Sequence, residues 1–264
     1  MPLPRHDLKE ALRDEGRSLG FDAVGFTRLD LLEDHTARLK AWVRGGRHAT
    51  LGYLAHTARS RGNPADYAGY AWVRSVLVAV HAYRAPETRP PAALPCPRPV
   101  ARYAEGPDYH AWMLERLRCL AVRAEVRAQR PLRSHAFCDT TALPEKRLAA
   151  AAGLGHLGRN SLLLTPRWGS WVVLGGLLLD LELPPDAASS AACPPGCRRC
   201  VEACPTAALD EHGLDARRCL SFWTTGTTRP APPEVAARLN GRRFGCDACQ
   251  EACPLSRDRY ATGR

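Results

Sequence analysis

The stretch Cys193-Pro-Pro-Gly-Cys197-Arg-Arg-Cys200-Val-Glu-Ala-Cys204-Pro205 decides the fold of the last third of this chain. A second stretch, Cys246-Asp-Ala-Cys249-Gln-Glu-Ala-Cys253-Pro254, repeats the same ending, and Cys219 lies between the two. In proteins with two [4Fe–4S] clusters, three closely spaced cysteines bind one cluster and a fourth, placed before proline, binds the other. We therefore expect a ferredoxin-like module that holds two such clusters.

The crossing rule predicts which four thiolates bind each cluster. One cluster is expected to take Cys193, Cys197, Cys200 and Cys253, and the other Cys204, Cys219, Cys246 and Cys249. Cys193 departs from the pattern, because three residues separate it from Cys197 where ferredoxins have two. Gly196 would let this longer loop fold back. The chain has eleven cysteines, and for two of those left over, Cys96 and Cys119, we expect a structural role.

Disulfide bonds and zinc binding are the two other uses that the cysteines could have. Disulfides are disfavoured because the sequence shows no export signal, and a reducing cytosol keeps thiols free. Zinc would suit the pairs Cys197/Cys200 and Cys246/Cys249, but it would leave the repeated Cys-Pro endings without a role. The two-cluster interpretation accounts for both endings.

Length, apolar runs and net charge limit the number of domains, the location and the partners that the chain can have. The chain has 264 residues, enough for one large or two unequal domains. Its longest apolar stretch, Trp171 to Leu179, is about half of the roughly 18 residues that a membrane span needs, so we expect no membrane association. The start Met1-Pro2-Leu3-Pro4 runs directly into charged residues, which predicts a cytoplasmic protein. A net charge of +10 suits a polyanionic partner such as RNA, or simply an arginine-rich surface.

Hydrophobic patterning predicts alternating helices and strands before the cysteines. After Leu183-Pro-Pro-Asp186, cysteine, proline and short polar connections replace long apolar elements, so we place a domain boundary there and expect domains at residues 1–186 and 187–264. The proline-rich segment 85–99 is expected to be a surface connection. Helices are predicted around 8–19 and at 29–44, 108–129 and 145–152, and strands at 22–27, 75–80, 162–164 and 171–179.

The segment Gly153-x-Gly155-x-x-Gly158 formally matches a dinucleotide-binding fingerprint. That fingerprint needs a strand before it and a helix opening at it, whereas here a helix should end at the glycines and a strand should follow. We therefore interpret Gly153 as a helix C-cap and the other two as positions of close backbone approach, and disfavour nicotinamide binding.

Beyond these patterns, the chain resembles the epoxyqueuosine reductase family over residues 8–254. The resemblance is carried by motifs that occur in the family's order: Arg61-x-Asn-Pro64, Arg102-Tyr103-Ala-x-Gly106, Asp108-Tyr109-His110, Asp139-Thr140, Glu145-Lys146, Ala152-Gly-Leu-Gly-x-x-Gly-Arg-Asn160, Gly169-Ser-Trp171 and Gly245-Cys-Asp247.

The resemblance implies a cobalamin-dependent reductase with two clusters that acts in the last step of queuosine synthesis on tRNA. It implies an α/β (α+β) cobalamin-binding domain of flavin-reductase-like character, joined to the ferredoxin-like module. A reductase, flavodoxin or ferredoxin would donate electrons. Full-length family members carry a helical-repeat region after this module. The printed sequence ends at Arg264, so the resemblance is to a short form.

Within this family Asp139 matches the proton donor. An aspartate of ordinary pKa, about 3.9, is ionised at neutral pH, so donation requires burial or a neighbouring anion to keep it protonated. Without the resemblance, a turn or helix cap would be the favoured role of this aspartate. The residues that the resemblance places against cobalamin or substrate are Arg61, Tyr103, Tyr109, His110, Asp139, Gly153, Gly155, Gly158, Asn160, Ser221, Thr224 and Asp247.

The chain departs from the family at Thr141-Ala142, His156, Gly176 and Gly226, which are substrate-side positions. Three hypotheses follow: a shortened epoxyqueuosine reductase, a cobalamin-dependent reductase for a different small substrate, or a non-catalytic protein that carries electrons or handles cobalamin.

Overall fold

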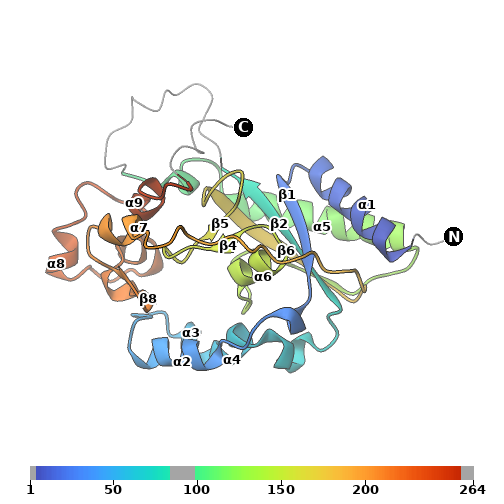
Figure 1. Ribbon diagram of the computed structural model, residues 1–264, viewed down its shortest axis with the longest axis horizontal. Coiled ribbons are helices and arrows are strands. Elements are labelled where there is room, and N and C mark those ends of the chain that lie inside the picture. Colours follow the sequence, from blue (N-terminus) through green and yellow to red (C-terminus); the bar gives the residue numbers. More distant parts are fainter. Residues whose placement is uncertain (1–3, 84–98, 257–264) are drawn as a thin grey trace, which may run out of the picture.

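The computed structural model describes residues 4–83 and 99–256 (Figure 1). Cys96 and nearly all of the proline-rich segment 85–99 lie outside these ranges. Before the cysteines the elements are α1 (Arg5–Ser18), β1 (Ala23–Thr27), α2 (Thr36–Arg44), α3 (Tyr53–His56), α4 (Ala58–Gly62), β2 (Ser75–Ala82), α5 (Tyr109–Ala128), β3 (Ser134–Phe137), α6 (Glu145–Ala151), β4 (His156–Leu157), β5 (Leu163–Leu164) and β6 (Val172–Leu179).

A four-stranded sheet organises the first two thirds of the chain, with strand order β1-β2-β6-β3. Every pairing in it is antiparallel, and β2 and β6 are the two central strands. In the register, Val78 faces Gly25 on one side and Gly176 on the other. The chain therefore mixes helices with an antiparallel sheet, which bears out the α+β form of the expected fold.

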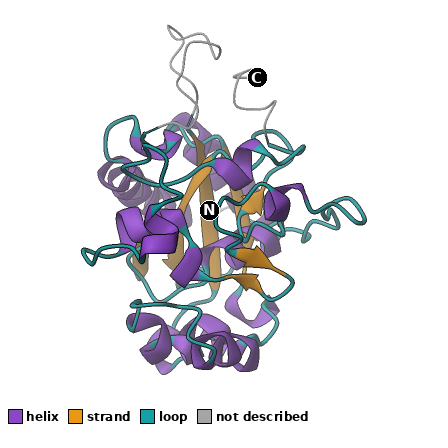
Figure 2. Cartoon of the chain, turned by 90° about the vertical axis from the view of Figure 1, so that its left-hand side faces the viewer, coloured by secondary structure: helices purple, strands orange, loops and turns teal. Residues whose placement is uncertain are grey.

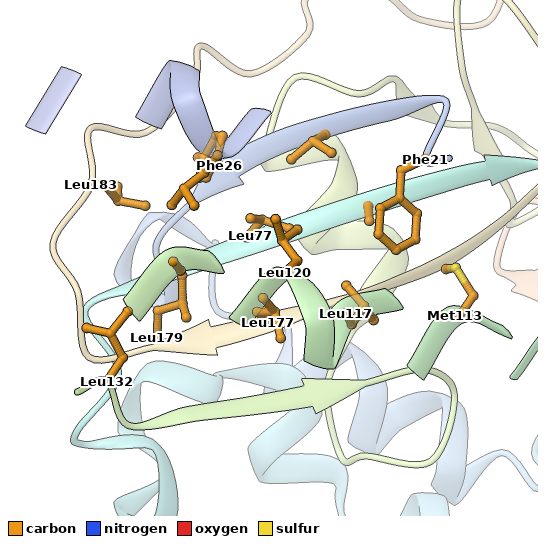
Figure 3. Packing of buried hydrophobic residues seen from close by; sticks show 14 of the residues in the cluster. Phe21, Phe26, Leu77, Met113, Leu117, Leu120, Leu132, Leu177, Leu179 and Leu183 are labelled. Atoms are coloured by element: carbon orange, nitrogen blue, oxygen red, sulfur yellow. The ribbon is translucent and has the colours of Figure 1, made fainter. Parts of the chain in front are cut away.

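Helices cover both faces of this sheet (Figure 1). Leu77 and Ala79 of β2 belong to a buried cluster with α1 and α5, in which Met113, Leu117 and Leu120 of α5 point at the strands (Figure 3). Val76 and Val78 point the other way, into a cluster with Leu148 and Ala149 of α6. Since side chains alternate across a strand, a strand covered on both faces is apolar throughout, and this explains the uninterrupted apolar run of β2.

Most of the predicted elements are confirmed, but the single helix predicted at 29–44 is wrong. Residues Leu29–Leu31 form one 3₁₀ turn, and α2 begins only at Thr36. Between them, the carboxylate of Asp34 accepts a 2.7 Å hydrogen bond from the backbone N–H of Thr36. A side chain that satisfies one of the free N–H groups of a first turn starts a new helix there, and the 3.6-residue pattern does not reveal this interruption.

The cysteine-rich segment consists of short elements: α7 (Arg199–Glu202), the hairpin β7 (Leu209–Asp210) and β8 (Gly213–Leu214), a π-helical turn at Phe222–Gly226, α8 (Pro233–Ala236) and α9 (Ala248–Glu251). Figure 2 looks onto the side of the molecule that carries them, where short helices are joined by loops.

Buried contacts tie this segment to the sheet. The indole N–H of Trp171 donates to the carbonyl of Ser256 at 2.7 Å, and the N–H of Ser170 donates to the Ser256 hydroxyl at 3.0 Å. At the start of the segment, Asp186 accepts hydrogen bonds from Arg13 and from the N–H of Phe26, both at 2.9 Å. The cysteine loops are thus held at a fixed place beside the sheet.

Over the described ranges, each helix is too short or too polar to cross a membrane.

Candidate functional site

Four thiols from the two ends of the cysteine-rich segment line one pocket, those of Cys193, Cys197, Cys200 and Cys253. Burial raises the pKa of Cys200, and the neighbouring thiols of Cys253, Cys193 and Cys197 raise it further. The structure therefore brings together the four residues expected to share one cluster, including Cys193 with its longer spacing.

The other four thiols form a second group. Burial raises the pKa of Cys249 well above its usual range, and Cys246, Cys219 and Cys204 add to the effect in that order. Cys200 of the first group also raises the pKa of Cys249, by a smaller amount, so the two groups lie close to each other. Backbone N–H groups of Phe222 and Ser221 donate to the Cys219 sulfur.

Both groups suit iron–sulfur clusters. Burying several thiols together is costly unless they bind a metal as thiolates, since each raises the pKa of the next. An N–H donor at a sulfur stabilises the thiolate and tunes the potential of a cluster. The α7 and α9 turns supply cysteines to both groups, because Cys200 and Cys249 lie within them while Cys204 and Cys253 follow directly.

A loop after β3 carries Asp139. Its backbone is left-handed, with φ of 59°, a conformation that is uncommon for a residue other than glycine and that clusters at functional sites. The hydroxyl of Tyr109 donates to the Asp139 carboxylate, and the Nε2 atom of His110 lies 3.1 Å from the same oxygen, Oδ2. The Nδ1 atom of His110 lies 2.6 Å from Asp108. Two consecutive residues at the start of α5 thus orient this aspartate.

The less exposed carboxyl of this region belongs to Glu145, not to Asp139. The side chain of Asp139 is 54% exposed, whereas partial burial of Glu145, together with the nearby Asp139, raises the pKa of Glu145 to about 8. The N–H of Asp139 donates to Oε1 of Glu145 at 2.8 Å. At neutral pH Glu145 is therefore mainly protonated. The family motif contained Glu145, but the sequence alone gave it no role, because its burial depends on the fold.

Lys146 connects this region electrostatically with the thiols. Its ammonium donates to the carbonyl of Ser161 at 2.6 Å and lies within electrostatic range of Asp139, Glu145 and Cys249. The acid loop and the second thiol group are therefore neighbours. Cys138, next to Asp139, is different from the eight clustered cysteines, because its thiol donates a hydrogen bond to the carbonyl of Leu174 at 3.3 Å.

Arg61 forms hydrogen bonds to the loop that carries Asp139. Its guanidinium donates to the carbonyls of Thr141 at 2.9 Å and Leu143 at 3.0 Å, and its Nε donates to the Thr57 hydroxyl at 3.0 Å. Arg61 thus holds the loop that carries Asp139. The hydroxyl of Thr141 is buried and has no hydrogen-bond partner among the described residues. An unpaired buried hydroxyl is expected where a polar ligand completes the site.

Other residues expected at the cofactor lie on the cluster side. Tyr103 stacks edge-on against Tyr109 with 6.4 Å between ring centres, and burial raises its pKa, with Asp247 and Asp139 contributing. Asp247 is buried and accepts from the N–H of Arg102 at 2.9 Å. The Thr224 hydroxyl accepts from the N–H of Gly245 at 2.9 Å, and the Ser221 carbonyl accepts from Thr224 and Thr225.

The glycine segment behaves as the sequence predicted. Gly153 has φ of +74° directly after α6, as a helix C-cap requires. A Cβ atom on Gly155 would lie 2.3 Å from the carbonyl oxygen of Leu164, and one on Gly158 would lie 2.6 Å from Oδ1 of Asn160. Asn160 itself lines the pocket of the first thiol group.

Two family models match the chain. Residues 61–140 match "Epoxyqueuosine reductase QueG, DUF1730", and residues 193–256 match the 4Fe-4S double cluster binding domain. The first match ends one residue after Asp139, and the second spans all eight clustered cysteines.

Curated relatives match nearly the whole chain. It is 36% identical to the epoxyqueuosine reductase of Pseudomonas aeruginosa, over 97% of this chain and 71% of the relative. It is 37% identical to that of Gloeobacter violaceus, over 93% of this chain and 75% of the relative.

Solved structures agree. Epoxyqueuosine reductase from Streptococcus thermophilus superimposes with a TM-score of 0.81 at 27% identity, over 95% of this chain and 66% of that chain. An epoxyqueuosine reductase solved with an epoxyqueuosine-modified tRNA stem loop has a TM-score of 0.81 at 29% identity, again over 66% of its length. The chain thus spans about two thirds of the solved relatives. By sequence and by fold, this chain belongs to the epoxyqueuosine reductase family.

Proposed function

We propose that this protein reduces epoxyqueuosine in tRNA to queuosine, with two [4Fe–4S] clusters and cobalamin as cofactors. The observation that carries the proposal is that one residue, Lys146, links the oriented acid Asp139 with the second group of four thiols. Lys146 lies within electrostatic range of both Asp139 and Cys249. A proton donor next to an electron supply is what reductive removal of an epoxide oxygen requires.

The cluster ligands are proposed as the two groups of four. Cys193, Cys197, Cys200 and Cys253 would hold one cluster, and Cys204, Cys219, Cys246 and Cys249 the other. Cys249 and Cys200 lie within electrostatic range of each other, and this closeness of the two groups supports electron transfer from one cluster to the other. The coupling of Lys146 to Cys249 supports the second cluster as the one nearer the acid.

The reaction consumes two electrons and two protons, breaks two C–O bonds and releases the epoxide oxygen as water while a C=C bond forms. When bound, cobalamin supplies a strongly reducing, nucleophilic metal centre for this step. Asp139 would protonate the departing oxygen, a role worth roughly 10²–10⁴ in rate for a well-placed acid. Tyr109 and His110 hold the Asp139 carboxylate in place. The protonated Glu145 lies close by, because its Oε1 accepts a hydrogen bond from the backbone N–H of Asp139.

The loop around Asp139 is the proposed cobalamin side of the site. The unpaired Thr141 hydroxyl and the Tyr103 ring would face the cofactor, while Arg61 would act by holding the loop. Ser221, Thr224 and Asp247 fix the backbone on the cluster side, and Gly153, Gly155 and Gly158 let the segment after α6 pass close to its neighbours. A related Bacillus subtilis structure is described with its catalytic aspartate loop swung out of the active site, which supports this loop as the mobile, reacting part.

Three broader features belong to the same proposal. Residues 1–186 would form the cobalamin-binding domain, of flavin-reductase-like character, and residues 187–264 the cluster module. The partner would be tRNA, which the net charge of +10 favours, in the cytoplasm. Electrons would come from a reductase, a flavodoxin or a ferredoxin.

The test is a multiple-turnover assay with anaerobically purified, cobalamin-reconstituted protein, a low-potential reductant and an epoxyqueuosine-containing tRNA stem loop. Formation of queuosine supports the proposal. If protein with full iron and cobalamin content leaves this substrate unchanged, the substrate assignment is wrong, and reduction of another epoxide or halide by the same sample would indicate a different small substrate.

A further inference from the structure

Among the residues around the first thiol group, Asn160 is the one polar side chain that is itself buried. The pocket formed by Cys193, Cys197, Cys200 and Cys253 is also lined by Asn160 and Arg159. Asn160 is only 5% exposed, whereas Arg159 is exposed and its charge is screened by water. A buried amide has to satisfy its hydrogen bonds inside the protein.

The oxygen of this amide is already engaged. Oδ1 of Asn160 accepts a 3.2 Å hydrogen bond from the backbone N–H of Leu162. Because a backbone N–H can only donate, this contact determines which end of the amide is the oxygen. Gly158 leaves room for the arrangement, since a Cβ atom there would lie 2.6 Å from Oδ1.

The nitrogen is not engaged. Nδ2 of Asn160 is fully buried, and no acceptor for it occurs among the residues that the structure describes. Leaving a buried donor unpaired costs about 1–3 kcal/mol, so native proteins rarely do so without a ligand. The pocket that this side chain lines is bounded by the four thiols and by the apolar residues Leu164, Pro194, Pro254 and Leu255.

We infer that Asn160 is a redox-tuning residue, whose amide N–H donates to a sulfur of the cluster held by Cys193, Cys197, Cys200 and Cys253. A hydrogen bond to a cluster sulfur stabilises the reduced, more negative state and raises the reduction potential. With the Asn160 donor, this cluster is therefore easier to reduce than it would be with its four thiolates alone. This inference rests on the ligand set proposed above and extends it to a residue that the family resemblance placed against cobalamin.

The experiment is an EPR-monitored redox titration of the anaerobic protein, which needs neither cobalamin nor tRNA. Asn160→Leu removes the donor with a side chain of similar size. Asn160→Asp keeps the oxygen that accepts from Leu162 and replaces only the NH₂ group. In both variants one cluster potential should fall while the other stays at its wild-type value. Asn240→Leu and Asn240→Asp, at an exposed turn residue, should change neither potential.

A second measurement needs no variant. The chain has three asparagines, Asn63, Asn160 and Asn240, so selective ¹⁵N-asparagine labelling is clean. The reduced wild-type cluster should show an electron–nuclear coupling to this label and to an exchangeable proton, and the Asn160 variants should lose both.

The outcomes separate this inference from the proposed function. Unchanged potentials at full iron content, or a wild-type spectrum without the asparagine coupling, would overturn the role of Asn160 alone. Protein that binds no iron under reconstitution would instead overturn the ligand set itself.

Discussion

The backbone N–H of Asp139 donates to Oε1 of Glu145 at 2.8 Å, so two carboxyl groups share one small region, in which Glu145 is partly buried and Asp139 is exposed. Glu145 holds a proton at neutral pH, while Asp139 reaches the surface with Tyr109 and His110 at its carboxylate. The two carboxyl groups therefore differ in their surroundings although they belong to one loop and the helix that follows it.

Replacing Asp139 by asparagine should abolish most turnover. The amide preserves the shape of the side chain but cannot donate the acid proton, so the rate should fall by roughly 10²–10⁴. The measurement is single-turnover conversion of the modified stem loop, with cobalamin and cluster spectra as the control. Wild-type rates in the variant would remove Asp139 from the chemistry.

Glu145→Gln should change how stability depends on pH. The ordinary pKa of a glutamate here is 4.5 and the folded protein raises it to about 8, so the unfolded chain loses this proton first as pH rises. The contribution of Glu145 to stability is therefore complete below pH 4.5 and is lost as pH rises to about 8. The glutamine variant lacks this loss. Its unfolding free energy relative to wild type should therefore rise across that range by at most about 5 kcal/mol, and its Tm should rise with it. A Tm difference that does not vary with pH would contradict a buried, neutral Glu145.

Arg61→Lys should loosen the loop that carries Asp139. A single ammonium cannot serve the carbonyls of both Thr141 and Leu143, so unfolding free energy should drop by about 1–2 kcal/mol. Thermal unfolding and limited proteolysis measure the effect. Arg59→Lys, at an exposed position two residues earlier, is the matched control and should behave like wild type.

Cys249→Ser should remove one cluster, lowering the iron content from about eight to about four per chain. The remaining cluster should belong to the pocket of Cys193, Cys197, Cys200 and Cys253. Cys119→Ser changes an exposed cysteine of α5 and should leave iron content unchanged. Full iron content in the Cys249 variant would show that the thiol groups are not the ligand sets.

Gly155→Ala should destabilise the protein by about 1–3 kcal/mol, because the added methyl would lie 2.3 Å from the carbonyl oxygen of Leu164 and the backbone must shift. Gly106→Ala, at a position with no neighbouring atom within 4 Å, is the control. Chemical denaturation compares the two, and equal midpoints would mean that this segment moves without cost.

The sequence alone was enough for those features that depend on local spacing. Cysteine spacing separated the eight clustered thiols from Cys119 and Cys138 and predicted their division into two groups of four. Short apolar runs predicted β1, β2 and β6, and apolar residues at helical spacing predicted α5, because burial of one face or of two imposes these patterns directly on the residues.

Tertiary structure decided what depends on residues far apart in the chain. The partial burial of Glu145, the hydrogen bonds of Arg61 to the loop of Asp139, and the position of Asn160 beside the thiols arise only when α4, α6 and the segment after α6 are brought together in the folded chain. A pKa and a hydrogen bond depend on the surrounding atoms, and those atoms are brought together only by the folded chain.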